Sequence, residues 1–285
     1  MYSLQKALSI ENQSIDFNLL KLNKAEINTI ENNITNVHPI VSGIQGELNL
    51  FRKHGLDSLK KAKLMNRVDT KFVIKRMHLI QIMRSLQSNY SVLSINNKEI
   101  SPYENHYFDT HNMEFYTAHH NGKLNRYKVR HYIDSQLRFL EVKFKNNKKR
   151  TIKSRMKVSD DSYSKIDSFV KKNMGGCMPE LHIKQISGYQ RIAFANESIG
   201  ERITIDYDVW YQSKASEPVL ELDDLCIVEI KQKSYNAQSS IFDLLKTLGY
   251  APTSFSKYCI GCALLYSEDI KTNRFKQMIK KHVNN

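Results

Sequence analysis

The sequence lacks a long apolar run and a secretory leader. No stretch approaches the roughly eighteen consecutive apolar residues that a membrane-spanning helix needs. The N-terminus also lacks a basic segment followed by an apolar core and a small-residue cleavage site, which together mark a signal peptide. The sequence therefore predicts a cytoplasmic protein without a transmembrane segment.

Cysteine is scarce, with four residues in a chain of 285. Cys177 and Cys226 stand alone, whereas Cys259 and Cys262 form one CxxC pair inside the apolar run YCIGCALLY. A structural zinc site needs four ligands, and neither a second cysteine pair nor a histidine pair lies at ligand spacing. This pattern argues against a zinc or redox centre and favours a core position for the pair.

Acidic residues are few relative to basic ones: 29 Asp and Glu against 43 Lys and Arg, a formal net charge of +14. An excess of this size indicates an anionic partner, which could be nucleic acid, an acidic membrane surface or a phosphorylated small molecule. Charge alone does not choose among them. The length allows one large or two ordinary domains.

The basic residues are sorted onto one face of three successive predicted strands, between residues 125 and 158. Side chains of a strand alternate between its two faces, so every second residue shares a side. In each strand one side is apolar, and the other carries mainly cations: Arg126, Lys128 and Arg130 in the first strand, Lys143 and Lys145 beside Glu141 in the second, and Lys153, Arg155 and Lys157 in the third.

A half-solvated sheet is the simpler interpretation of any one such strand. Like charges directly opposite one another across strands destabilise a sheet, however, and an ordinary solvent face mixes both signs. A nearly uniform lattice of Lys and Arg is best explained by a polyanion held between the strands. The first functional prediction is therefore a phosphate-rich ligand.

Other predicted strands repeat this amphiphilic pattern. Lys71 lies on the charged side of the first, NRVDTKFVI, and Glu229 aligns with Lys231 in CIVEIKQK. Because nearly every strand has a polar face, closing the sheet is the simplest way to shelter it. The predicted fold is α+β: a closed antiparallel β-barrel of about eight strands with flanking helices, which forms a tunnel lined by basic residues and a few carboxylates.

Nine short sequence motifs occur in a fixed order along the chain: NRVDTKF, YFDT, NRYKVRHY, FLEVKFK, TIKSR, SGYQRIAF, ERITID, VEIK and SFSKY. In that order and spacing they resemble the vacuolar transporter chaperone (VTC) type polyphosphate polymerase domain, one of the triphosphate tunnel metalloenzymes. The resemblance implies a tunnel domain over residues 51–266. Residues 1–50 are then an N-terminal extension, helical or partly disordered, and residues 267–285 a basic C-terminal tail.

The resemblance also implies roles for individual residues. Glu229 matches the carboxylate that holds a divalent metal, Mn²⁺ or Mg²⁺. The phosphate-binding positions, which would also stabilise the transition state, map onto Lys71, Lys128, Arg130, Lys143, Lys153, Arg155, Arg191, Lys231 and Lys257. The first strand departs from the E-x-E-x-K pattern of the related CYTH enzymes, since Arg67, Asp69 and Lys71 stand there, which argues against that branch.

The leading function prediction is a polyphosphate polymerase that transfers the γ-phosphoryl group of ATP to a growing inorganic polyphosphate chain. The alternatives are a triphosphatase that hydrolyses inorganic or organic triphosphates, and a non-catalytic module that binds polyphosphate or another polyanion. Specific nucleic-acid binding is not expected, because many aromatic residues fall opposite the cations, as in FLEVKFK. Oligomeric state and peripheral association with a membrane transport partner stay open.

Overall fold

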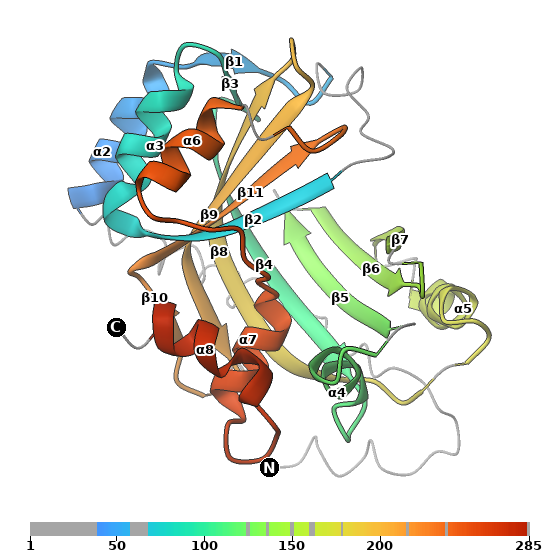
Figure 1. The fold of residues 1–285 in the computed structure, drawn as a ribbon. Helices are drawn as coiled ribbons and strands as arrows, with labels where there is room; N and C mark the ends of the chain where they lie inside the picture. The colour runs from blue at the N-terminus through green and yellow to red at the C-terminus, as the bar shows by residue number, and fades with distance from the viewer. Residues whose placement is uncertain are drawn as a thin grey trace.

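The chain is built around a curled antiparallel sheet (Figure 1). The computed structural model describes residues 39–57, 68–123, 126–134, 137–148, 151–159, 163–177, 179–214, 217–236 and 239–283. Neighbouring strands along the sheet are, in order, β2 (Val68–Lys75), β11 (Leu225–Gln232), β9 (Glu201–Gln212), β8 (His182–Asn196), β4 (Ile100–Asp109), β5 (Arg126–Asp134), β6 (Leu137–Lys145) and β7 (Thr151–Val158). Three short strands, β1 (Arg52–His54), β3 (Ser91–Leu93) and β10 (Leu220–Leu222), pair at the side of this path.

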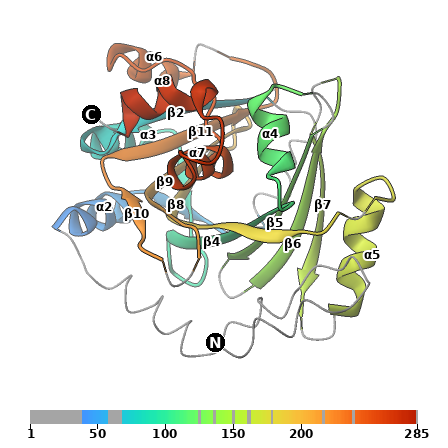
Figure 2. The ribbon, with the colours of Figure 1, turned by 90° about the horizontal axis from the view of Figure 1, so that it is seen from below.

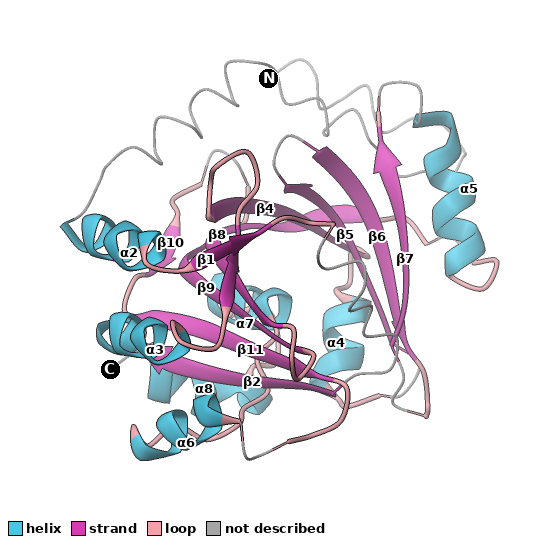
Figure 3. Ribbon diagram, turned by 90° about the horizontal axis from the view of Figure 1, so that it is seen from above, coloured by secondary structure: helices cyan, strands magenta, loops and turns pink. Residues whose placement is uncertain are grey.

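The mixed α+β class and the antiparallel sheet are as predicted, but the sheet is not closed. Strands β2 and β7 are its two ends, and no pairing joins them within the described ranges (Figure 3). The closed barrel expected from the sequence is therefore not confirmed. Alternation along a strand determines which face a side chain takes, but it does not determine whether the first and last strands meet.

Helices cover the convex face of the curl in two places. The first group is α2 (Pro39–Asn49), the 3₁₀ turn η3 (Arg76–His78), α3 (Leu79–Leu86) and α6 (Ser240–Thr247), which lie over the end of the sheet that begins with β2. The second is α5 (Tyr163–Asn173) beside β7. The apolar residues Val129, Leu140 and Val142 are buried against Ile166 and Val170 of α5. The predicted apolar face is thus the convex one.

Three further helices occupy the inside and one end of the curl: α4 (Glu114–His120), α7 (Lys257–Leu265) and α8 (Asn273–His282) (Figure 2). Helix α7 lies inside the curl, and its Cys259 and Cys262 are free and fully buried, which confirms their predicted core position. No helix in the described part of the chain is long and apolar enough to span a bilayer.

Strand β9 has a β-bulge opposite β8, and it contributes both a carboxylate and apolar side chains to the concave face. Asp208 has a left-handed backbone (φ 49°) and its carboxylate is paired with Arg76. This extra residue re-phases the alternation, so that Asp206 contacts Lys257 of α7 and Val209 also packs in the cluster around α7. The bulge therefore places the Asp206 carboxylate next to the apolar residues on which α7 packs.

Candidate active site

The concave face collects the cations that the sequence singled out. Their alternation along β5, β6 and β7 puts them on the side opposite the residues packed under α5. Contacts confirm the shared face, because most of these cations meet the same few carboxylates or the start of α7. Arg155 lies directly opposite Glu141 across β6 and β7. The predicted phosphate-binding cations on this face are Lys71 on β2, Lys128 and Arg130 on β5, Lys143 on β6, Lys153 and Arg155 on β7, Arg191 on β8, Lys231 on β11 and Lys257 on α7.

Glu141 on β6 neutralises one group of these cations. Its fully buried carboxylate lies 2.8 Å from Arg130 Nε, 3.1 Å from Lys143 Nζ and 2.5 Å from Lys153 Nζ. Burial alone would raise the pKa of Glu141, but the three cations outweigh it and hold the pKa far below its ordinary value. The predicted lattice of like charges is therefore tied together by an internal anion.

Asp206 on β9 plays the same part for a second group. Both of its carboxylate oxygens accept from Arg191, from Nε at 2.5 Å and from Nη2 at 2.7 Å, and Lys257 Nζ also contacts it. Burial would raise the pKa of Asp206, but Arg191 and Lys257 lower it to about 2. Asp206 lies in the motif ERITID, but a strand pattern alone does not reveal which helix packs against that face.

Glu229 on β11 is the third carboxylate of the concave face. Lys231 Nζ lies 2.6 Å from Oε2 and Lys71 Nζ 3.6 Å from Oε1. Burial would raise the pKa of Glu229, but Lys231 and Lys71 hold it far below its usual range, so the group stays an anion. Asp69 shares this face, opposite Lys231 across β2 and β11.

A hard divalent cation fits the surroundings of Glu229. Mg²⁺ and Mn²⁺ take oxygen ligands, and one or two carboxylates suffice when phosphates and water complete the shell. In the described ranges no three or more His, Cys, Asp or Glu side chains form a metal-holding group by themselves. The donor set therefore suits a metal that arrives together with phosphate oxygens rather than one enclosed by protein.

Residues at the start of α7 form hydrogen bonds to strands on both sides of the curl, β2 and β5. Lys71 on β2 donates to the Phe255 carbonyl at 3.3 Å, and Lys128 on β5 donates to Ser256 Oγ at 3.0 Å. Ser256 is also the N-cap of α7, where its Oγ accepts from the Cys259 amide. Because a helix N-terminus carries partial positive charge, α7 adds to the positive potential of the face.

Two partly buried lysines on this face are held in an environment that disfavours their charge. Burial lowers the pKa of Lys128 to about 8, and Lys71 and Arg130 add repulsion. Burial likewise lowers the pKa of Lys257 to about 8, although Asp206 opposes the shift. Within the described chain Lys128 has no carboxylate partner, and its Nζ lies near the faces of two tyrosine rings. An anion bound beside Lys128 would restore its full charge.

The cationic face continues toward α4 and α8. Arg126 and Lys145 are directly opposite one another across β5 and β6, next to the pair Lys128 and Lys143. The pKa of His119 in α4 reflects the excess of positive charge here. Burial is the largest cause that lowers this pKa to about 3, and repulsion by Lys128, Arg126, Arg274 and Lys145 lowers it further. This end of the face is therefore strongly positive.

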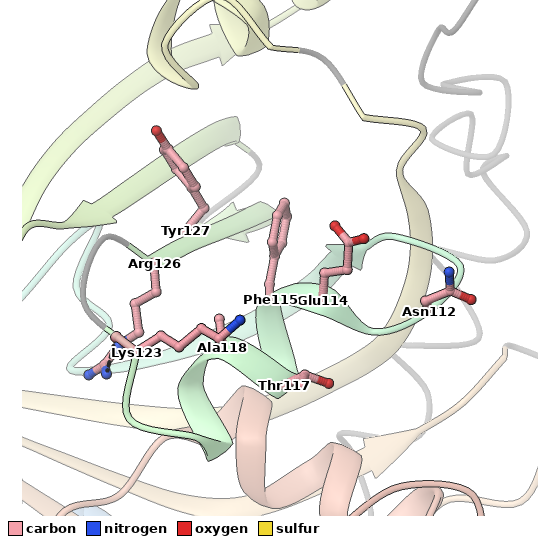
Figure 4. Close-up of a pocket in the computed structure, with 8 residues that line it drawn as sticks. All are labelled: Asn112, Glu114, Phe115, Thr117, Ala118, Lys123, Arg126 and Tyr127. Atoms are coloured by element: carbon pink, nitrogen blue, oxygen red, sulfur yellow. Dashed lines mark hydrogen bonds between the residues drawn. The ribbon is translucent and has the colours of Figure 1, made fainter.

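A pocket of about 370 Å³ lies between α4 and the start of β5 (Figure 4). Lys123 and Arg126 line one side, and Phe115 and Tyr127 contribute rings. The pocket borders the positive end of the concave face, because Arg126 belongs to both.

Aromatic residues also occupy the concave face, which the sequence had not indicated. Tyr103 and Tyr189 stack with ring centroids 5.2 Å apart, and the Arg191 guanidinium lies 4.9 and 5.1 Å from the two centroids. Tyr189 is buried, so this pair steadies Arg191 and does not form an open platform for stacking bases.

Comparison with known families identifies the family of the chain. The model of the VTC domain matches residues 66–266. The chain belongs to the VTC-domain family. A search of curated proteins gives no match.

Solved structures that resemble the chain include a putative adenylate cyclase from Bacillus halodurans, with 11% identity and a TM-score of 0.46 over 67% of this chain and 94% of that one. A second is a putative adenylyl cyclase from Hippeastrum described as having a dominant triphosphatase activity, with 12% identity and a TM-score of 0.42 over 70% and 96%. A third is the PH1819 protein from Pyrococcus horikoshii, with 12% identity and a TM-score of 0.39 over 68% and 95%. The family match alone carries the assignment.

Proposed function

We propose that this VTC-domain protein is a polyphosphate polymerase, which transfers the γ-phosphoryl group of ATP to the end of an inorganic polyphosphate chain held along the concave face. The observation that carries the proposal is the length of the cationic row. It runs from Lys71 on β2 to Lys153 on β7 and continues to the pair Arg126 and Lys145. A single triphosphate needs a local cluster, whereas an elongating polyanion needs cations along its whole path.

The chemistry of phosphoryl transfer suits such a face. A nucleoside triphosphate brings about four negative charges, and catalysis consists mainly of holding the reacting oxygens in line while that charge is neutralised. Arg130 and Arg191 are fixed by Glu141 and Asp206, so their positions are set before substrate binds. A terminal phosphate of the polymer is already anionic near neutral pH, so it can act as the acceptor without a strong general base.

Glu229 is the proposed metal-holding carboxylate, with Mn²⁺ or Mg²⁺ as the ion. When bound, such an ion would neutralise phosphate charge and orient phosphate oxygens. Lys231 and Lys71 keep Glu229 ionised and hold its two oxygens. The protein's own contribution at this point is thus a fixed, deprotonated carboxylate beside two phosphate-binding lysines.

The decisive experiment supplies the full chain with ATP and Mn²⁺, with and without short polyphosphate, and follows polymer on gels together with ADP and free phosphate. We expect polymer to accumulate in step with ADP while free phosphate stays low. ADP and free phosphate formed in equal amounts, even with the primer present, would identify a triphosphatase instead. Binding of polyphosphate without consumption of ATP would identify a binding module.

Glu229→Gln tests the metal assignment. This variant keeps the shape of the side chain but removes the charge, so we expect the fold to persist and the metal-dependent turnover to fall at least 100-fold, about 2.7 kcal/mol in the barrier. Glu221→Gln, on the exposed side of β10, makes the same change away from the face and serves as the control. Normal metal-dependent turnover in Glu229→Gln would place the metal elsewhere.

A further inference from the structure

Asn105 and Ser187, on the concave face, each carry a side-chain group that has no hydrogen-bond partner among the described residues. Asn105 on β4 and Ser187 on β8 are directly opposite one another in the sheet, so their side chains lie next to each other on the same face. Both residues are fully buried. Within the described chain, neither Asn105 Nδ2 nor Ser187 Oγ has a hydrogen-bond partner.

Arg130 fixes the orientation of the Asn105 amide. Its Nη1 donates to Asn105 Oδ1 at 2.9 Å, while its Nε donates to Glu141 at 2.8 Å. Since the guanidinium carries only donors, the amide must present its oxygen to Arg130 and turn its NH₂ group away from it. The unpartnered N–H groups of Asn105 and the hydroxyl of Ser187 are therefore two donors beside a phosphate-binding arginine.

An unpaired buried donor is costly, and native proteins pair nearly all of theirs. Two such donors side by side are best explained by an acceptor that the protein itself does not supply. The group that suits them accepts hydrogen bonds and offers none, and it also suits the adjacent guanidinium. A phosphate oxygen has all of these properties.

We infer that Asn105 and Ser187 form an uncharged phosphate subsite next to Arg130. This inference rests on the proposed binding of phosphates along the concave face, and it adds two substrate-contacting residues that carry no charge. Asn105 has a second part to play as a positioning residue, because its Oδ1 holds Arg130 on the side away from Glu141. One phosphate group thus receives a guanidinium, an amide and a hydroxyl together.

The test measures binding of inorganic tripolyphosphate by titration calorimetry, together with initial rates of polymer synthesis. In Asn105→Asp the acceptor for Arg130 is kept, but the N–H donors are lost and a negative charge faces the phosphate. We expect the affinity to fall roughly 10- to 100-fold, the equivalent of one hydrogen bond to a charged group. Ser187→Ala should weaken binding about tenfold, and Ser187→Thr, which keeps the hydroxyl, should retain most of it.

A purely structural role gives a different pattern. Gln190→Ala removes an amide from the opposite face of β8 and should leave tripolyphosphate affinity unchanged. If Asn105→Asp and Ser187→Ala bind tripolyphosphate like the wild type, or lose affinity only in proportion to lost folded protein, the inference is wrong. If the wild type itself fails to bind tripolyphosphate, the proposed function fails instead, so the two failures are distinguishable.

Discussion

At the scale of single residues, three carboxylates control the charge of the concave face. Glu141, Asp206 and Glu229 each bind two or three of the cations that would otherwise repel one another. The pairs are partly or fully buried, so removing one carboxylate would leave uncompensated charge, which is a large penalty. The cations are consequently held in fixed positions, and they still outnumber the carboxylates that pair with them.

Lys128 and Lys257 make polyanion binding depend on pH. Both have a pKa of about 8 in the free protein, so both are charged below that value and lose charge as the pH rises through it. A bound phosphate favours the charged form. The affinity for inorganic tripolyphosphate should therefore be highest below pH 8 and fall by up to about tenfold per pH unit per lysine above it.

This prediction is checked by titrations at constant ionic strength between about pH 7 and pH 9.5, a range that spans the pKa of about 8 of both lysines in the free protein. Lys128→Arg provides the control, because a guanidinium remains charged throughout the range and should flatten the decline. An affinity for the wild type that stays constant up to the highest pH would show that neither lysine titrates in contact with the ligand.

At the scale of elements, the position of α7 depends on Gly261. A Cβ atom at this residue would lie 2.5 Å from both Gln185 Oε1 and Tyr211 Cδ1, closer than such contacts allow. The helix therefore approaches β8 and β9 only because this position has no side chain. That close approach brings Lys257 to Asp206 and Ser256 to Lys128.

Gly261→Ala should consequently destabilise the protein, even though alanine is the better helix former. We expect a loss of about 1–3 kcal/mol in the free energy of unfolding, because the added methyl group overpacks the contact. Phosphate binding should weaken as well, since Lys257 moves with the helix. Gly46→Ala in α2, where nothing lies within 4 Å of the new Cβ, should instead be neutral or stabilise by up to about 1 kcal/mol.

Urea denaturation of the two variants measures this difference directly. An equal change in the free energy of unfolding for both variants would mean that α7 can shift without cost. The position of Lys257 would then not depend on Gly261. The CIGC sequence gave no hint of this role, because the need for a glycine arises only from the strands that pack against the helix.

Alternation along each strand could be predicted from the sequence, whereas contacts between distant elements could not. The cationic and apolar faces of β5, β6 and β7 follow from alternation within each strand, and the structure has them on the concave and convex sides. The contacts of Asp206 with Lys257, and of Asn105 with Arg130, join strands and helices far apart in the chain. The first contact depends on the helix inside the curl and on the bulge at Asp208, and the second depends on which strands pair, so no local pattern encodes either.

At the scale of the whole molecule, the net charge of +14 is not spread evenly. Much of it lines the inside of the open curl, between the end strands β2 and β7. A concave face with a net positive charge raises the local concentration of an anionic ligand and speeds its association, and both effects weaken with salt. The arrangement thus suits a long polyanion more than a small neutral substrate.

The pair formed by Arg126 and Lys145 tests whether a polymer follows this path. These residues lie at the positive end of the face, beyond the cations bound by Glu141. Neutralising both, as Arg126→Gln with Lys145→Gln, should leave the initial rate of ATP consumption nearly unchanged, because Glu229, Arg130 and Arg191, which are proposed to act on the reacting phosphates, are left intact. The product should become shorter, since the growing chain loses two charge-assisted contacts of about 1.5–3 kcal/mol each and dissociates sooner.

The matched control is Lys171→Gln with Lys172→Gln, which removes the same charge from the exposed last turn of α5 outside the curl. Gel analysis of polymer length at equal ATP consumption separates the two double variants. A path along the concave face shortens the product only in the first, whereas attraction by net charge alone shortens it equally in both. Unchanged length in both variants would mean that the chain leaves the face before it reaches α4, with its far end in solvent.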